Sequence, residues 1–141
     1  MTDPDLTRDA FLDGRVQAWQ PRAGYRAATD PVLLAAAVPA RAGQSVLELG
    51  CGVGVASLCL AARVPGLEMT GVEVQAEYAA LARRNAAENG AALQVVEADL
   101  EALPTDLRAR RSAVSIQTAS GVSSRNALSR PAFCAAGPWG A

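Results

Sequence analysis

Residues 46–54 read Val-Leu-Glu-Leu-Gly-Cys-Gly-Val-Gly, an apolar run that passes directly into a turn with glycine at every second position. Glycine tolerates positive φ angles and has no Cβ, so such a turn lets a bound group approach the backbone closely. A strand that leads through a glycine-rich turn into a helix is typical of α/β proteins that bind the adenosyl part of a cofactor. The turn around Gly50, Gly52 and Gly54 therefore predicts an α/β fold with a nucleotide-type cofactor site.

The spacing of these glycines separates two kinds of cofactor. A dinucleotide fingerprint has glycines at its first, third and sixth positions, and the sixth position counted from Gly50 is Val55. Glycines at the first, third and fifth positions, with Glu48 two residues before the first, resemble motif I of the class I S-adenosylmethionine (SAM) dependent methyltransferases. A nicotinamide dehydrogenase remains the alternative, and binding of NAD in place of SAM would support it.

Two further acidic residues extend this pattern. Glu73 lies 19 residues after Gly54, where a second strand should end, and an acid there can accept hydrogen bonds from both ribose hydroxyls. Asp99 follows the next apolar run and is placed to face the adenine amine. Each acid also has a simpler explanation, because Glu73 could be a solvated strand end and Asp99 a helix cap. Together with Glu48 they favour SAM.

Composition bounds the class of protein. The chain has 141 residues, half of them hydrophobic, which allows one domain with a real core. No stretch approaches the ~18 consecutive apolar residues of a membrane span. The first residues, Met-Thr-Asp-Pro-Asp-Leu, are acidic and polar, so no secretory signal is visible. We therefore expect a cytoplasmic location and no membrane partner.

The residue types also exclude several chemistries. The chain has three cysteines without metal-ligand spacing and no histidine, which disfavours disulfide frameworks, zinc sites and a histidine base. A net charge of −1 predicts no broad electrostatic footprint for nucleic acid. No metal ligands and no catalytic acid-base pair are predicted.

Hydrophobic periodicity predicts strands that alternate with helices. Asp30 is expected to cap a helix with Pro31 at its first position, and a looser alternation around Asp13-Gly14 predicts a hairpin or extended arm over 11–20. Alternation of this kind implies right-handed crossovers and a parallel sheet. Strands are expected at 45–49, 67–73, 93–97 and 113–117, and helices at 31–38, 53–63, 75–88 and near 104–106.

The composition changes after about Arg111. Residues 1–111 contain two serines, whereas 112–141 contain six and no Asp or Glu. We therefore expect three regions: an N-terminal arm and helix (1–42), a cofactor-binding core (43–111) and an atypical, irregular tail (112–141).

The segment upstream of the glycine turn narrows the family. Gln20-Pro21, Gly24-Tyr25-Arg26, Thr29-Asp30 and Leu33-Leu34-Ala35 resemble the N-terminal segment of the small-domain methyltransferases that include the bacterial tRNA1(Val) adenine-N6 methyltransferases. The resemblance covers roughly residues 6–111. It implies a Rossmann-like class I methyltransferase fold, SAM as the cofactor and tRNA as a possible substrate.

The resemblance also implies roles for particular residues. In that family the Arg-x-x-Thr-Asp stretch packs beside the cofactor, motif I carries the glycine turn, and two later acids hold the ribose and face the adenine. Cys51 is interpreted as a small residue that fills space under the turn rather than as a nucleophile. The implied cofactor-binding residues are Arg26, Thr29, Asp30, Glu48, Gly50, Cys51, Gly52, Gly54, Glu73 and Asp99.

One motif of the family is missing. After the fourth strand the family carries Asn-Pro-Pro-Tyr, which holds the amine to be methylated, whereas this chain has Val122-Ser123-Ser124-Arg125-Asn126-Ala127-Leu128. The hypothesis is that the tail is truncated or frameshifted and that the chain keeps the N-terminal half of the sheet. The function expected is that of an incomplete SAM-dependent N-methyltransferase. The alternatives are a non-catalytic fragment that binds SAM or S-adenosylhomocysteine, and an unstable fragment without function.

Overall fold

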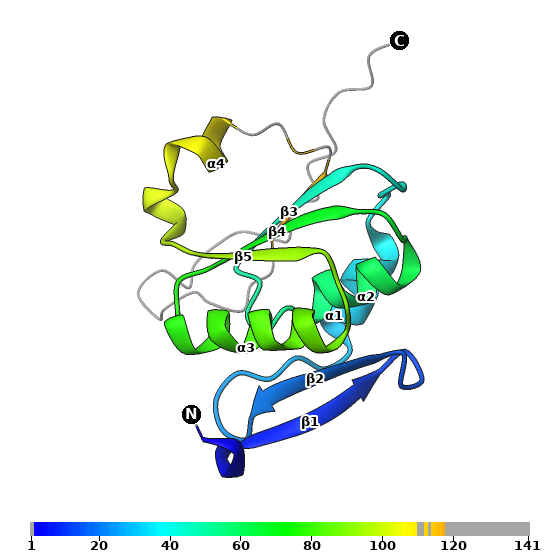
Figure 1. Ribbon diagram of the computed structural model, residues 1–141, viewed down its shortest axis with the longest axis vertical. Coiled ribbons are helices and arrows are strands. Elements are labelled where there is room, and N and C mark those ends of the chain that lie inside the picture. The colour runs from blue at the N-terminus through cyan, green and yellow to red at the C-terminus, as the bar shows by residue number, and fades with distance from the viewer. Residues whose placement is uncertain (1, 110–111, 113, 118–141) are drawn as a thin grey trace.

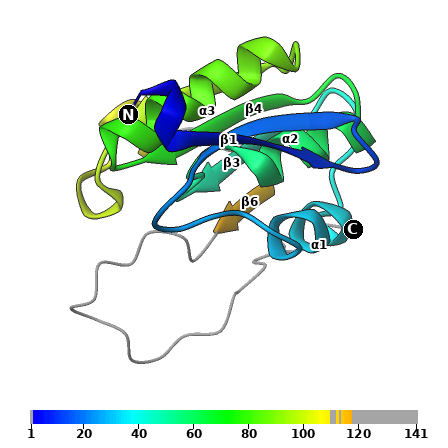
Figure 2. The same cartoon turned by 90° about the horizontal axis from the view of Figure 1, so that it is seen from below.

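The computed structural model describes residues 2–109, 112 and 114–117. At its centre is a four-stranded parallel sheet in the order β5-β4-β3-β6. Figure 1 shows β3, β4 and β5 side by side, and Figure 2 shows β6 next to β3. The predicted class, α/β with a parallel sheet and flanking helices, is confirmed. Of the predicted irregular tail (112–141), residues 114–117 form the last strand of this sheet, while 113 and 118–141 lie outside the described residues. The strands are β3 (Ser45–Leu49), β4 (Glu68–Glu73), β5 (Leu93–Glu97) and β6 (Val114–Gln117).

Two helices connect the first three strands of this sheet. They are α2 (Val55–Arg63) and α3 (Ala76–Glu88), and both lie on the same face of the sheet (Figure 1), as successive crossovers of one hand require. Alanines give α3 a high helix propensity. It ends as predicted, with Asn89 as the C-cap and Gly90 at a φ of 61°.

A hairpin forms a third layer outside these helices (Figure 1), and it lies in front of them in the view from below (Figure 2). Its strands are β1 (Leu6–Phe11), which follows a short 3₁₀ turn (Asp3–Asp5), and β2 (Val16–Pro21). The predicted hairpin is confirmed but starts earlier than expected, because the half-buried residues Thr7 and Asp9 of β1 are polar and hide its alternation. Its turn includes Leu12, Asp13 and Gly14 at φ angles of 52°, 55° and 81°.

The indole of Trp19 fastens this hairpin to α3. The guanidinium of Arg84 lies 4.2 Å from the ring centroid, and that of Arg8 lies 5.8 Å away. The indole Nε1 also donates to the carboxylate of Glu88, at 3.0 Å from each oxygen. Cation–π contacts and a charge-assisted hydrogen bond therefore converge on one aromatic side chain.

The helix before the sheet, α1 (Asp30–Ala37), starts one residue earlier than predicted. The N-cap is Thr29, which has φ −80° and ψ −33°, and its carbonyl accepts a hydrogen bond from Leu33 N at 3.0 Å. The prediction that Asp30 is the cap was wrong, because Thr29 already has helical backbone angles and makes Asp30 the first helical residue. At the other end of α1, Arg63 donates from Nε to the carbonyl of Ala35 at 3.1 Å and from Nη2 to that of Val38.

The hydrophobic core lies on both sides of the helix layer, because buried side chains of the sheet (Val46, Met69) and of the hairpin (Val16, Ala18) belong to one cluster. Leu58 and Leu60 of α2 are 1% and 0% exposed in it. Packing is tight at Gly71, where an added methyl group would lie 2.7 Å from Cys51 Sγ. Beyond β5, a 3₁₀ turn (Leu100–Ala102) and α4 (Thr105–Ala109) lead to the other face of the sheet. Within the described ranges, no helix has the length and apolar character that a bilayer crossing requires.

Candidate functional site

The strand order places the glycine turn at the point where the sheet's connectivity changes direction. From β3 the chain steps to β4 and then β5, whereas β6 pairs with the opposite edge of β3. In open α/β sheets, ligands bind outside the carboxyl ends of the strands at such a switch point. The turn over 50–54 follows directly on β3, so topology and sequence pattern select the same place.

The conformation of the turn explains its glycines. Gly50, Gly52 and Gly54 have φ angles of 73°, 55° and 87°, in the region that residues with a Cβ rarely adopt. Gly50 N and Cys51 N both donate to the carbonyl of Val72, at 2.8 and 2.9 Å. Gly54 N donates to the carbonyl of Cys51 at 2.8 Å. The turn is therefore bonded to the end of β4 and closed on itself.

Glu73, the last residue of β4, is built into this turn. Its side chain is buried, and Oε2 accepts a hydrogen bond from Gly52 N at 2.9 Å while Oε1 accepts one from Gln75 N at 2.9 Å. Burial excludes the alternative that Glu73 is a solvated strand end. Each carboxylate oxygen has a second lone pair, so these bonds leave acceptor capacity for hydroxyl groups.

Glu48 lies beneath the turn and is fully buried. It accepts a hydrogen bond from Ser57 Oγ of α2. A cavity of about 20 Å³, the size of one water-sized group, opens beside it and brings the turn together with the chain before α1. Its lining residues are Tyr25, Ala27, Pro31, Glu48, Cys51, Gly52, Val53, Val55 and Ala56.

The predicted residues of the Arg-x-x-Thr-Asp stretch lie around this cavity rather than in its lining. Arg26 donates from Nη2 to Asp9 Oδ2 at 2.6 Å and from Nη1 to the carbonyl of Pro21 at 2.7 Å. Thr29 caps α1 and Asp30 is exposed at its start. The structure thus gives Arg26 and Thr29 fold-supporting contacts, and a cofactor role for these residues stays a prediction.

Asp99 lies at the carboxyl end of β5 and is exposed. Its Oδ1 accepts a hydrogen bond from Glu101 N at 2.9 Å, so it caps the 3₁₀ turn. The neighbouring strand end is close, because Ala98 N donates to the carbonyl of Glu73 at 3.1 Å. Asp99 therefore caps a helical turn, as the simpler explanation had it. It also lies at the carboxyl edge of the sheet, where the adenine was expected.

Two apolar residues at the same edge were missed in the sequence. Val74 is 49% exposed and Leu100 is 37% exposed; among the large hydrophobic side chains of the described residues, Tyr25 and Leu33 are exposed as well. Each directly follows one of the two predicted acids, Glu73 and Asp99. That position, an apolar residue immediately after the acid at a strand end, is the signal that could have found them.

The thiols near the turn are not nucleophiles. Burial, and then the carboxylates of Glu48 and Glu73, raise the pKa of Cys51 far above its ordinary value. Burial and Glu48 raise the pKa of Cys59 to about 11. Because the thiolate is the reactive form, both side chains are unreactive at neutral pH. Cys51 packs as the small residue under the turn that the sequence predicted. The described residues contain no cluster of three or more His, Cys, Asp or Glu suited to a metal ion.

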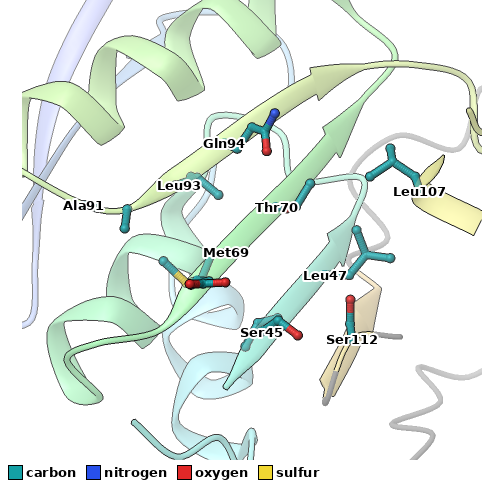
Figure 3. Close-up of a pocket in the computed structure, with 12 residues that line it drawn as sticks. Ser45, Leu47, Met69, Thr70, Ala91, Leu93, Gln94, Leu107 and Ser112 are labelled. Carbon is teal, nitrogen blue, oxygen red and sulfur yellow. The ribbon is translucent and has the colours of Figure 1, made fainter. Parts of the chain in front are cut away.

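A larger cavity, of about 690 Å³, lies elsewhere (Figure 3). It opens on the sheet face away from α2 and α3, with Leu107 of α4 and Ser112 at its border. Its strand residues come from the amino-terminal halves of β3, β4 and β5, away from the glycine turn. Size therefore does not identify the cofactor site, and topology points to the smaller cavity. The strand residues that line the larger one are Ser45, Val46, Leu47, Glu68, Met69, Thr70, Leu93 and Gln94.

The fold and the turn define a Rossmann-like nucleotide-binding domain of the methyltransferase type. Residues 46–130 match the methyltransferase domain family, which is more than half of the chain. The chain belongs to this family, and its cofactor is SAM, as the sequence predicted.

Two curated relatives are similar over about half of the chain. One is the tRNA1(Val) (adenine(37)-N6)-methyltransferase of Yersinia enterocolitica, 41% identical over 69 residues, which are 48% of this chain and 28% of that protein. The other is ribosomal RNA small subunit methyltransferase C of Aeromonas hydrophila, 41% identical over 68 residues, 48% of this chain and 20% of that protein. The matched part thus spans less than a third of either relative.

Solved structures agree on the fold. The Pyrococcus abyssi tRNA (uracil-54, C5)-methyltransferase in complex with S-adenosyl-L-homocysteine aligns with a TM-score of 0.61 and 19% identity, over 79% of this chain and 27% of that one. A SAM-dependent methyltransferase from Agrobacterium tumefaciens aligns with a TM-score of 0.60 and 20% identity, over 83% and 40%. The Rossmann-like methyltransferase fold is confirmed.

Proposed function

We propose that the chain binds SAM at the carboxyl ends of β3, β4 and β5. The observation that carries the proposal is the glycine turn at the switch point of the sheet, with the carboxylate of Glu73 holding Gly52 N at 2.9 Å. Residues 43–111 would form the cofactor-binding core, and 1–42 the arm beside it.

Each part of the cofactor has residues of suitable chemistry. The backbone of Gly50, Gly52 and Gly54 offers close approach without a Cβ. Glu73 accepts hydrogen bonds from the ribose hydroxyls on its remaining lone pairs. At the adjacent edge, the exposed side chains of Val74 and Leu100 offer apolar contact to the adenine.

The remaining predicted residues surround the rest of the cofactor in this proposal. Asp99 faces the adenine amine from the end of β5. Glu48, with Cys51 beneath the turn, lies on the side of the methionine portion, where the segment from Arg26 through Thr29 to Asp30 closes the cavity. These assignments follow the family resemblance and the position of the small cavity.

The proposed reaction is methyl transfer to a base amino group of RNA, of the tRNA adenine-N6 type. SAM supplies an activated methyl group on a sulfonium, so the protein need only align the acceptor and exclude water. Support for RNA comes from the two curated relatives, both of which are RNA methyltransferases.

A second candidate is a module that binds SAM or S-adenosylhomocysteine without transferring a methyl group. The observation that favours it is in the sequence, where no Asn-Pro-Pro-Tyr occurs among the 141 residues. Without that loop, the acceptor amine lacks the groups that hold it in the resembling family.

Calorimetric titration with S-adenosylhomocysteine tests the cofactor site. We expect binding by the wild type and an affinity at least about tenfold lower in Glu73→Ala, since ribose hydrogen bonds to a carboxylate contribute more than about 1.4 kcal/mol. Gly52→Val should also lose binding because its φ is 55°. Glu68→Gln, at the opposite end of β4, is the matched control and should bind as the wild type does. Unchanged affinity in both site variants would refute the site.

Transfer of a tritiated methyl group from SAM to bulk tRNA separates the two candidates. Incorporation above a no-enzyme control supports the transferase. Binding of S-adenosylhomocysteine without incorporation supports the non-catalytic module, and binding of NAD in its place would overturn both.

A further inference from the structure

Two asparagines at the end of α3 bond to the free edge of β2. Asn89 Oδ1 accepts a hydrogen bond from Gln17 N at 3.0 Å, and its Nδ2 donates to Gln17 O at 2.7 Å. Asn85 does the same at Trp19, where Oδ1 accepts from N at 2.8 Å and Nδ2 donates to O at 3.1 Å. The spacings match, because four helical residues rise about 6 Å and two strand residues about 6.6 Å. The two side chains thus replace a missing neighbouring strand.

Asn85 differs from Asn89 in the acceptor of its second amide hydrogen. The second hydrogen of Asn85 Nδ2 goes to the carbonyl of Val53, in the glycine turn, at 2.9 Å. The corresponding donor of Asn89 returns to the carbonyl of Asn85 in its own helix at 2.7 Å. Asn85 is fully buried, and its amide oxygen and both amide hydrogens are hydrogen-bonded.

This bond fixes one peptide group of the turn from both sides. The Val53 carbonyl is held by Asn85, while the amide of the same peptide, Gly54 N, donates to the carbonyl of Cys51 at 2.8 Å. Rotation of that peptide would break both bonds and leave buried polar groups unpaired, which is costly. Gly54, the N-cap of α2 at φ 87°, is thereby held in its left-handed conformation.

The hairpin sets the orientation of the Asn85 amide. Because Trp19 N donates to Oδ1, the Nδ2 group must point the other way, toward the carbonyls of Trp19 and Val53. A reversed amide would place its oxygen against two carbonyl oxygens. The backbone of β2 therefore determines which atom of Asn85 the glycine turn meets.

We propose that Asn85 is a positioning residue for the cofactor site, which holds the glycine turn in its binding conformation through the Val53 carbonyl. The inference rests on the proposed SAM site, and it extends that site to a side chain of α3 that lies outside the turn and the strand ends.

The pair Asn85→Ala and Asn89→Ala provides the test in the chain of 141 residues. Both variants lose two hydrogen bonds to β2, and only the first loses the bond to the turn. Amide hydrogen exchange at Gly52 and Gly54 is measured by NMR without ligand. It should be at least about tenfold faster in Asn85→Ala than in Asn89→Ala, because only Asn85→Ala loses a buried hydrogen bond to the turn. The affinity for S-adenosylhomocysteine should fall by a similar factor in Asn85→Ala alone.

The exchange rates and the affinities should be measured at a temperature at which the melting curve of each variant shows that it is fully folded. If Asn85→Ala has no cooperative melt, Asn85→Ser, which keeps one donor, takes its place. Equal effects of the two variants on exchange and affinity would overturn the proposal, because Asn85 would then act through hairpin docking alone. If the wild type does not bind S-adenosylhomocysteine, the proposed function fails, while the exchange comparison still decides whether Asn85 positions the turn.

Discussion

The two faces of the parallel sheet differ in how completely they are packed. On the face that carries α2 and α3, Leu58 is 1% exposed and Gly71 has no room for a methyl group beside Cys51. On the opposite face, half-buried Leu47 and exposed Gln94 border a cavity of about 690 Å³. The two faces belong to the same strands, so alternation along each strand decides which side chains are rigidly held.

This difference bears on the site. Glu48 shares its strand parity with Val46, and Glu73 shares its parity with Met69 and Gly71, so both acids point toward the packed face. Both acids are buried because they lie at the strand positions that face the helices. The proposed cofactor site is therefore supported by the packed face, whereas the open face contributes neither acid.

The largest expected effect is the loss of a core side chain from the packed face. Leu58→Ala should lower the free energy of unfolding by about 2–5 kcal/mol, through lost burial and the cavity left behind. Leu47→Ala, on the open face, should cost about 1 kcal/mol or less, because the site is already half solvated. Urea denaturation of the two variants measures both values. Equal losses would remove the distinction between the faces.

Overpacking at Gly71 should have the next largest effect. Gly71→Ala places a methyl group 2.7 Å from Cys51 Sγ and should cost about 1–3 kcal/mol. The double variant with Cys51→Ala should recover part of that cost, since the sulfur is then absent. A double-mutant cycle by urea denaturation measures the recovery. Additive costs would show that the two side chains do not meet.

A smaller effect is expected from the buried thiol of Cys59. Burial raises its pKa from 9.0 to about 11, so the unfolded chain loses this proton at a lower pH than the folded chain does. The contribution of this thiol to the free energy of unfolding is therefore fully present below pH 9 and is lost as the pH rises toward 11. The loss is about 1 kcal/mol over the first pH unit above 9. Urea denaturation at about pH 8 and about pH 10 should show a smaller decline in Cys59→Ala than in wild type. An identical decline would mean that the thiol is not shielded.

The smallest effect is expected on the open face. Gln94→Arg should change the free energy of unfolding by no more than about 0.5 kcal/mol, because an exposed position accommodates a long charged side chain. Thermal melting of this variant beside the wild type measures the change. A loss above about 1 kcal/mol would indicate that this face is covered in solution.

Much of the fold follows from local sequence. The apolar run into Gly50, the alanines of α3 and the Asn89-Gly90 cap each act within a few residues, and each is where it was predicted. The position of the acids Glu48 and Glu73 beside the turn could be predicted because their spacing from the glycines is fixed by one strand and one crossover.

Other features depend on contacts between distant parts of the chain. The pairing of Asn85 with Trp19 joins residues 66 positions apart, and the ion pair of Arg26 with Asp9 requires the folded hairpin. No local pattern encodes either contact. The predicted cofactor roles of all the site residues remain predictions. For Arg26, Thr29 and Asp99 the contacts that the structure shows are to other parts of the fold.

The position of Trp19 between two guanidinium groups makes it a natural reporter of the molecule's outer layer. Arg8 belongs to the hairpin itself, but the contact of the indole with Arg84 and its hydrogen bond to Glu88 exist only while the hairpin lies against α3. In a Trp139→Phe background, which leaves Trp19 as the single indole, detachment of the hairpin would expose it to water and shift its emission to longer wavelength. Fluorescence would then separate the release of this layer from the melting of the sheet.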